Sequence, residues 1–199
     1  MSPISSVQQG VVAQYEFAKL LILTSDGQLE PAVPVSDDDR RDFEVHVKRN
    51  FKTNLAVQLK SAIFLQHQFR SYNLAITFTV RKDRLVSDPL FWYAIMCLNL
   101  ASLGYRDPLF LVNSEEMHRH ASPRLIGDIW HFEFFANMSP DSKDRWRPSQ
   151  VAGKDLGKTV LQLLREVPLR TAPSNVAVQE LSRLEQLVWV RHRDLATEG

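Results

Sequence analysis

The sequence predicts an α+β fold in a single domain over residues 11–199, and three observations support this. The chain has 199 residues, enough for one domain with a substantial core. Strand-like patterns lie mostly in the first two thirds, whereas helical patterns dominate the last third. An apolar run without a polar face, at 91–98, marks the centre of the core. This order favours a mixed sheet with helices over a doubly wound parallel sheet.

The N-terminal part is predicted to form an arm followed by two strands. Residues 1–10 are expected to be a flexible arm, because they carry no sustained apolar pattern. Residues 15–23 are predicted to form a strand. Asp26-Gly27 is a strong tight-turn signal. A short return strand is expected over 29–35, where two prolines limit it to a sheet edge.

The next part is predicted to form a strand–helix–strand unit. The charged segment 36–42 is expected to be solvated surface, with a carboxylate cluster for a metal as the alternative. Residues 43–48 alternate apolar with polar, as in a half-buried strand. A helix is expected over 54–69, and 74–80 is the clearest strand of the sequence. Together these elements predict a right-handed βαβ unit with parallel strands.

A buried helix over 88–103 is the predicted centre of the fold. Asp88 suits the cap of the first turn, Pro89 suits the first helical position, and Gly104 suits the C-terminal end. A helix that is apolar all the way round is normally buried on every side. The single cysteine, Cys97, lies within it and is expected to be a core residue, and it allows no internal disulfide.

The remainder is predicted to contain two strands and two helices. Residues 109–112 and 129–135 are expected to be strands, and 113–123 is expected to be a polar loop. The helical C-terminal part is expected to comprise helices over about 154–167 and 174–194.

Basic residues supply the candidate binding surfaces. If the strands of the βαβ unit are parallel, their C-terminal ends form one cationic rim that could hold nucleic acid or an anionic membrane surface. This rim comprises Lys48, Arg49, Lys52, Arg81, Lys82 and Arg84. A second basic segment places Trp146 between Arg145 and Arg147, where an exposed ring could stack on a base. The alternative interpretation of both segments is ordinary solvated surface.

The last predicted helix carries a candidate protein interface. Its apolar stripe could dock on a second copy or on another protein, and the alternative is packing against its own core. The stripe comprises Leu181, Leu184, Leu187, Val188 and Trp189.

Two motifs are weaker indications of chemistry. Residues 152–159 resemble a loose phosphate loop with Lys158 and Thr159, but no buried strand precedes them, so a helix start is expected. His118 and His120 have the spacing of a metal pair, but their polar surroundings predict exposed loop histidines. We therefore predict no cofactor, no metal and no catalytic residue.

Composition leaves several function classes open. The net charge of +1 excludes a global basic field, and the N-terminus has no secretory pattern, so an intracellular, cytoplasmic protein is expected. The leading interpretation is a non-enzymatic interaction or assembly protein, structural or scaffolding, of a size compatible with a viral matrix-type protein. The alternative is a nucleic-acid-binding protein that uses the basic rim. The second alternative is a nucleotide- or metal-dependent enzyme.

Overall fold

The structure confirms the α+β fold. It is a computed structural model that describes residues 4–35, 41–68 and 71–166, with the side chains of residues 51 and 52 excepted. Sheet A contains β1 (Leu29–Ala32), β2 (Phe43–Val47), β3 (Asn50–Ala62), β6 (Phe91–Asn99), β7 (Gly104–Asn113) and β10 (Gln150–Val151). Sheet B contains β4 (Gln66–Gln68), β5 (Ser71–Arg81), β8 (Arg124–Ile126) and β9 (Ile129–Asn137). The α-helices are α1 (Ser6–Thr24), α2 (Ser114–His120) and α3 (Leu156–Glu166), and the 3-10 turns are η1 (Lys82–Arg84), η2 (Arg147–Ser149) and η3 (Gly153–Asp155).

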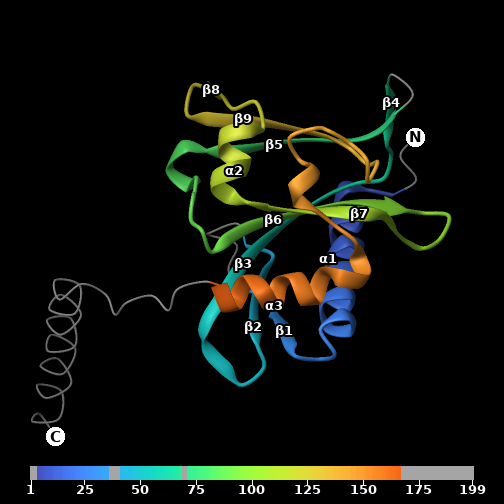
Figure 1. Ribbon diagram of the computed structural model, residues 1–199. Coiled ribbons are helices and arrows are strands. Elements are labelled where there is room, and N and C mark those ends of the chain that lie inside the picture. Colours follow the sequence, from blue (N-terminus) through green and yellow to red (C-terminus); the bar gives the residue numbers. More distant parts are fainter. Residues whose placement is uncertain (1–3, 36–40, 69–70, 167–199) are drawn as a thin grey trace, which may run out of the picture. The chain divides into compact units, whose positions relative to one another are not determined.

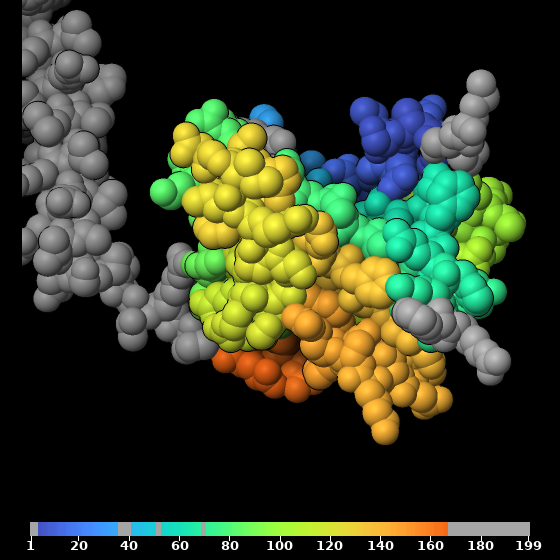
Figure 2. Space-filling model, turned by 90° about the horizontal axis from the view of Figure 1, so that it is seen from above, coloured from blue at the N-terminus to red at the C-terminus, as the bar shows by residue number. Residues whose placement is uncertain are grey.

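These elements form three layers (Figure 1). Sheet A is the middle layer, with the strand order β1-β2-β3-β6-β7-β10. Helices α1 and α3 pack on one of its faces, and sheet B packs on the other with the order β4-β5-β9-β8. Two apolar cores result, one on each side of sheet A. Figure 2 looks onto sheet B, where β5, β8 and β9 lie at the surface.

Helix α1 replaces the strand predicted over 15–23. Ser5 begins it with a capping box, in which its Oγ accepts from the backbone N of Gln8 at 3.2 Å. Its buried residues Ala13, Phe17 and Leu21 are spaced by four, which places them on one helix face. The continuous apolar run at the end of the helix made this spacing of four hard to recognise in the sequence. The helix also begins inside the segment 1–10 that was expected to be an arm.

The central apolar segment is a strand, so the prediction of a buried central helix over 88–103 is wrong. Strand β6 pairs in parallel with β3 and antiparallel with β7, and both of its faces are buried. A strand that is buried on both faces has the same continuous apolar sequence as a buried helix. Asp88 caps no helix; its Oδ1 accepts from the backbone N of Leu90 at 2.8 Å.

The predicted βαβ unit is also absent. Residues 50–62 form strand β3, in which Leu55, Val57 and Leu59 alternate into the core beneath α1 and α3. The parallel pair is β3 and β6, and the chain between them passes through β4 and β5 of sheet B. The helix predicted over 54–69 is therefore wrong, because the alternation of β3 was read as a helical stripe.

Other predicted elements are confirmed. The strands expected at 43–48, 74–80, 109–112 and 129–135 correspond to β2, β5, β7 and β9, and the helix expected over 154–167 is α3. Helix α2 lies within the segment that was expected to be a polar loop. The helix predicted over 174–194 lies outside the described residues.

Candidate functional site

The predicted cationic rim does not form, because its members lie in different sheets. Lys48 and Arg49 are exposed in the turn between β2 and β3 of sheet A, and Arg49 adopts a positive φ of 66°. Arg81 ends β5 of sheet B, and η1 follows with Lys82 and Arg84. Figure 1 shows this turn and η1 at separate places. The predicted proximity rested on parallel strands of a βαβ unit that the fold lacks. The side chain of Lys52 lies outside the described part of the structure.

Part of the basic charge is neutralised locally. The Arg81 guanidinium contacts the Asp83 carboxylate at 3.0 Å, and its hydrogen bonds hold the pKa of Asp83 below its usual value. Arg124 is paired with Glu133 in the same way. All five rim residues whose side chains are described are exposed, namely Lys48, Arg49, Arg81, Lys82 and Arg84.

Trp146 does not form the predicted stacking platform. Its side chain is 4% exposed, and its ring centroid lies 4.8 Å from that of Phe134 in the core between the sheets. Arg145 and Arg147 are exposed beside it, and Arg145 Nη1 donates to the backbone oxygen of His120 at 3.1 Å. Aromatic residues in polar loops are often anchors of the loop, and Trp146 has this role. The predicted interface at 181–189 lies outside the described residues.

A polar cluster that the sequence analysis missed lies where β2 begins beside β3. Asp42 directly precedes β2, and its backbone N donates to Val57 O at 2.9 Å. Its carboxylate Oδ2 accepts from the backbone N of Leu59 at 2.7 Å. Leu59 is the residue between Gln58 and Lys60, so the carboxylate lies at the backbone of the segment of β3 that carries these two residues.

Gln58 and Lys60 lie on the face of sheet A that is opposite α1 and α3. They alternate with Val57 and Leu59, which belong to the helix-side core. Gln58 is only 6% exposed. The Lys60 Nζ lies 5.4 Å from the centroid of the Phe78 ring in β5. A buried amide and a lysine are thus held by strands rather than by loops, which fixes their positions.

Helix α1 contributes two glutamines to the same region. Gln14 Nε2 donates to Asp42 Oδ1 at 3.0 Å. Gln9 Nε2 donates to the backbone oxygen of Ser61 at 2.6 Å. We call Gln14, Asp42, Gln58 and Lys60 the Asp42 cluster. The sequence signal that could have found it is Asp42 together with a Gln58-x-Lys60 pattern in an otherwise apolar strand.

The chemistry of the Asp42 cluster suits a hard cation bound beside a phosphate. In the described part of the chain, no three His, Cys, Asp or Glu side chains are grouped closely enough to enclose a metal ion. Mg²⁺, however, is held by one or two carboxylates together with water and substrate phosphate oxygens. The Asp42 carboxylate, the Gln58 amide oxygen and the Lys60 ammonium are groups of this chemical kind, and they are carried by one short part of the β2–β3 pair.

A second polar group is the partly buried His118 of α2, which was predicted to lie exposed in a loop. Its Nδ1 lies 2.6 Å from Ser87 Oγ, and its Nε2 lies 2.9 Å from the Tyr93 hydroxyl. Burial lowers the pKa of His118 from 6.5 to about 4, so the ring is neutral at pH 7. His120 instead contacts Glu116 at 3.3 Å, and the two histidines share no site.

The phosphate-loop pattern at 152–159 is a tight packing site. A Cβ atom built on Gly153 would lie 1.4 Å from the Tyr105 hydroxyl, and one on Gly157 would lie 2.4 Å from the backbone N of Ser25. Both glycines therefore serve close packing. Gly157 N donates to Thr24 Oγ1 at 2.7 Å, which ties the start of α3 to the end of α1.

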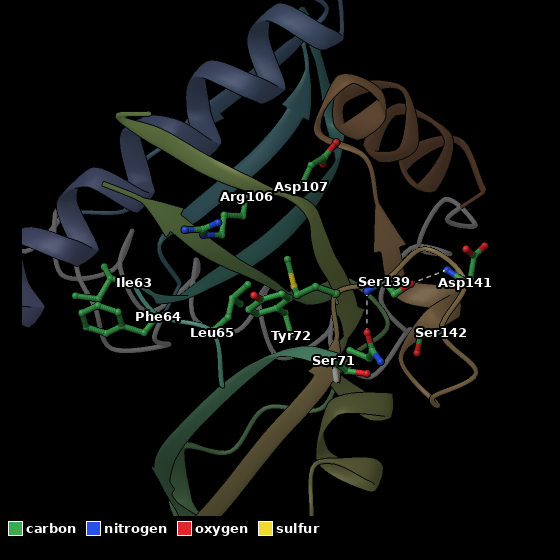
Figure 3. A pocket seen from close by; sticks show the side chains of 12 residues that line it. Ile63, Phe64, Leu65, Ser71, Tyr72, Arg106, Asp107, Ser139, Asp141 and Ser142 are labelled. Carbon is green, nitrogen blue, oxygen red and sulfur yellow. Dashed lines mark hydrogen bonds between the residues drawn. The ribbon is translucent and has the colours of Figure 1, made fainter. Parts of the chain in front are cut away.

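A pocket of about 810 Å³ opens at the end of β3 (Figure 3). Its walls come from the segment between β3 and β5, from β7 and from the loop after β9. Phe64 and Tyr72 line it with side chains that are 65% and 61% exposed. Arg106, Ser71 and Ser139 supply polar groups. The predictions from sequence included none of these residues.

The comparisons with known proteins give similarity to solved structures alone. No family model matches the chain, and no curated protein matches it. Among solved structures, the chain is similar to a bacterial homing endonuclease, with 13% identity and a TM-score of 0.49. The alignment covers 80% of this chain and 95% of that chain. We therefore argue the function of this chain from its own residues.

The leading interpretation from the sequence, a non-enzymatic assembly protein, is corrected. The two features on which the interpretation depended lack support: the rim is divided between two sheets, and the apolar helix lies outside the described residues. In the part that is described, no helix is long and apolar enough to cross a membrane.

Proposed function

We propose that the protein binds nucleic acid and hydrolyses its phosphodiester backbone at the Asp42 cluster. The observation that carries this proposal is the hydrogen bond from Leu59 N to Asp42 Oδ2, which fixes a carboxylate at the backbone between Gln58 and Lys60. A carboxylate with a lysine at a fixed position is a group of residues suited to phosphoryl transfer.

Each residue of the cluster has a distinct part in this chemistry. A water oxygen would form a bond to phosphorus while the bond from phosphorus to one ester oxygen breaks, and the leaving oxygen ends as an alcohol. The Lys60 ammonium would stabilise the negative charge that develops on the phosphoryl oxygens. Asp42 and Gln58 would hold a divalent cation, which supplies Lewis acidity and an activated water. Gln14 would orient the Asp42 carboxylate through its hydrogen bond.

Two exposed surfaces of the molecule support nucleic acid as the substrate. The exposed cations Lys48 and Arg49 lie in the turn of the β2–β3 hairpin, whose other end carries the Asp42 cluster. Such charges contact phosphates independently of sequence. The outer face of sheet B presents Thr77 and Thr79, with His131 opposite Thr79. A polar antiparallel sheet is a known means of reading a nucleic-acid groove.

The test is cleavage of plasmid and of linear duplex DNA by the full chain in the presence of Mg²⁺ or Mn²⁺. Lys60→Met keeps the apolar stem of the side chain against Phe78 and removes the charge, so we expect a loss of roughly 10²-fold to 10³-fold in rate. Asp42→Asn is preferred to Asp42→Ala, because alanine would leave the backbone N of Leu59 without its acceptor.

The matched control is Lys158→Met, which removes an exposed lysine from α3, a helix packed on the opposite face of sheet A. We expect it to cleave at the wild-type rate. Circular dichroism confirms that each variant is folded. Equal cleavage by the wild type, Lys60→Met and Asp42→Asn would show that the cluster is not the site. A lack of DNA and RNA binding at low salt would contradict the proposal altogether.

A further inference from the structure

The pocket at the end of β3 has three properties that belong to a binding site. Its volume of about 810 Å³ lies within the range of small-molecule sites. It is lined by two largely exposed aromatic rings, those of Phe64 and Tyr72. It also contains an exposed arginine, Arg106. We infer that this pocket binds one unpaired nucleotide of a nucleic-acid strand, with the base against Phe64 and Tyr72 and its phosphate at Arg106.

The two rings are the basis for recognition of the base. Large aromatic side chains are usually buried, because they remove much apolar surface from water. Here both rings remain open and lie at the wall of the same pocket (Figure 3). Stacking on an aromatic ring is tolerant of base identity, since every base has a π-face. Met138 adds a polarizable apolar contact to the lining.

Arg106 is the basis for recognition of the phosphate. In the described residues, no carboxylate lies within ion-pair distance of its guanidinium. The neighbouring Asp107 is engaged elsewhere, because its Oδ1 accepts from Gly153 N at 2.8 Å. Asp141 lines the end of the pocket opposite Arg106 (Figure 3). A guanidinium in this position can bind a phosphate with two parallel hydrogen bonds.

The position of the pocket links it to the Asp42 cluster. Arg106 pairs with Cys97, which belongs to the core between the sheets, and Lys60 faces the same side of sheet A. Lys60 precedes Ile63 at the pocket wall by three residues, so the pocket lies at the end of the strand that carries Lys60. A nucleic-acid strand with one phosphate at Lys60 would run along β3 toward the pocket, where an unpaired nucleotide would enter.

This inference rests on the proposed function, and it predicts a preference for nucleic acid with a single-stranded end. The experiment measures the binding of fluorescent duplexes to the full chain in EDTA, where metal-dependent cleavage is prevented. One duplex is blunt, and two others carry a three-nucleotide overhang at the 5′ or the 3′ end. We expect an overhang to be bound at least about 10-fold more tightly than the blunt end.

Three variants test the assignment of residues. Tyr72→Ala and Arg106→Gln should each reduce the preference for an overhang to less than about 3-fold. Tyr15→Ala removes a tyrosine that is 75% exposed on α1, and it should keep the full preference. A wild type without a preference would overturn the inference. A preference that persists in both Tyr72→Ala and Arg106→Gln would also overturn it.

The outcome also separates this inference from the proposed function. Cleavage of blunt duplexes that depends on Lys60, without any overhang preference, would remove only the nucleotide pocket. An overhang preference that depends on Tyr72, without any cleavage, would support the pocket and remove only the hydrolysis. Titration with adenosine 5′-monophosphate gives an independent reading, because a bound mononucleotide should shift the Tyr72 ring resonances in the NMR spectrum, and no shift at saturation would count against the pocket.

Discussion

The two faces of sheet A differ in what they bury. Beneath α1 and α3, β3 presents Leu55, Val57 and Leu59 to a core built from apolar side chains. On the opposite face, β3 presents Gln58, which is 6% exposed, and Lys60, whose Nζ lies 5.4 Å from the Phe78 ring centroid of sheet B. Burying polar groups is unfavourable unless they are hydrogen-bonded. Both faces bury an apolar core, and the contrast is local to the end of β3: its helix side is apolar, whereas its side toward sheet B carries the polar groups of the proposed site.

The largest expected effect is on the helix-side face. Phe17 of α1 is fully buried, and its ring centroid lies 5.8 Å from that of Phe43. Phe17→Ala should lower the free energy of unfolding by about 3–5 kcal/mol, because it leaves a cavity in the helix-side core. Urea denaturation followed by circular dichroism measures this change.

Tyr15→Ala on the exposed side of α1 is the matched control, and it should change the free energy of unfolding by less than about 0.5 kcal/mol. The folded fraction of Phe17→Ala should cleave DNA at the wild-type rate. A selective loss of cleavage in this variant would contradict the placement of the proposed site on the side of β3 toward sheet B.

A smaller effect is expected from His118 on the sheet-B side. Its pKa is lowered from 6.5 to about 4 by burial, so the unfolded chain binds a proton at a higher pH than the folded protein does. Stability from this residue is complete above pH 6.5, declines as the pH falls, and is lost below about pH 4. We expect the free energy of unfolding to fall by about 1–2 kcal/mol between pH 7 and pH 5 from this residue.

Urea denaturation at four pH values between 7 and 4 measures this dependence. His118→Gln should flatten it, because glutamine keeps polar atoms near Ser87 and Tyr93 but does not titrate. His67→Gln removes an exposed imidazole and serves as the control. If both variants keep the slope of the wild type, protonation of His118 is not linked to folding.

Sequence reasoning identified the fold class and several strands for a physical reason. Strands such as β2 and β5 have one buried face, and an alternating pattern reports that face directly. The same reasoning fails for β6, because a strand that is buried on both faces shows no alternation of apolar and polar residues. In β3, the apolar residues at 55 and 59 also have a helical spacing, and the neighbouring strands that decide between the two are distant in sequence.

The candidate site could not be read from the sequence for a related reason. Its members are Gln14, Asp42, Gln58 and Lys60, which come from a helix, a strand start and a strand. Only the pairing of β2 with β3 brings Asp42 to Leu59. The prediction of a cationic rim was wrong for the converse reason, because it assumed parallel strands of a βαβ unit that the fold does not contain. A sequence shows which residue types are present, but the pairing and register of the strands decide which of their side chains come close together.

The smallest effect sharpens the comparison at the boundary between the faces, where α1 reaches the Asp42 cluster. Gln14 donates to Asp42 Oδ1 at 3.0 Å, so the cluster has an amide where a second carboxylate would fit. Gln14→Glu should tighten the binding of Mg²⁺ or Mn²⁺ by about 10-fold, because Mg²⁺ favours one or two carboxylates. Without a cation, the two adjacent carboxylates should repel each other and lower the Tm. Calorimetric titration and the cation-dependent rise in Tm measure both effects.

Gln14→Ala removes the hydrogen bond without adding charge and should show no gain in cation affinity. Adding Asp42→Asn to Gln14→Glu should abolish the gain, and a gain that survives this change would place the cation away from Asp42.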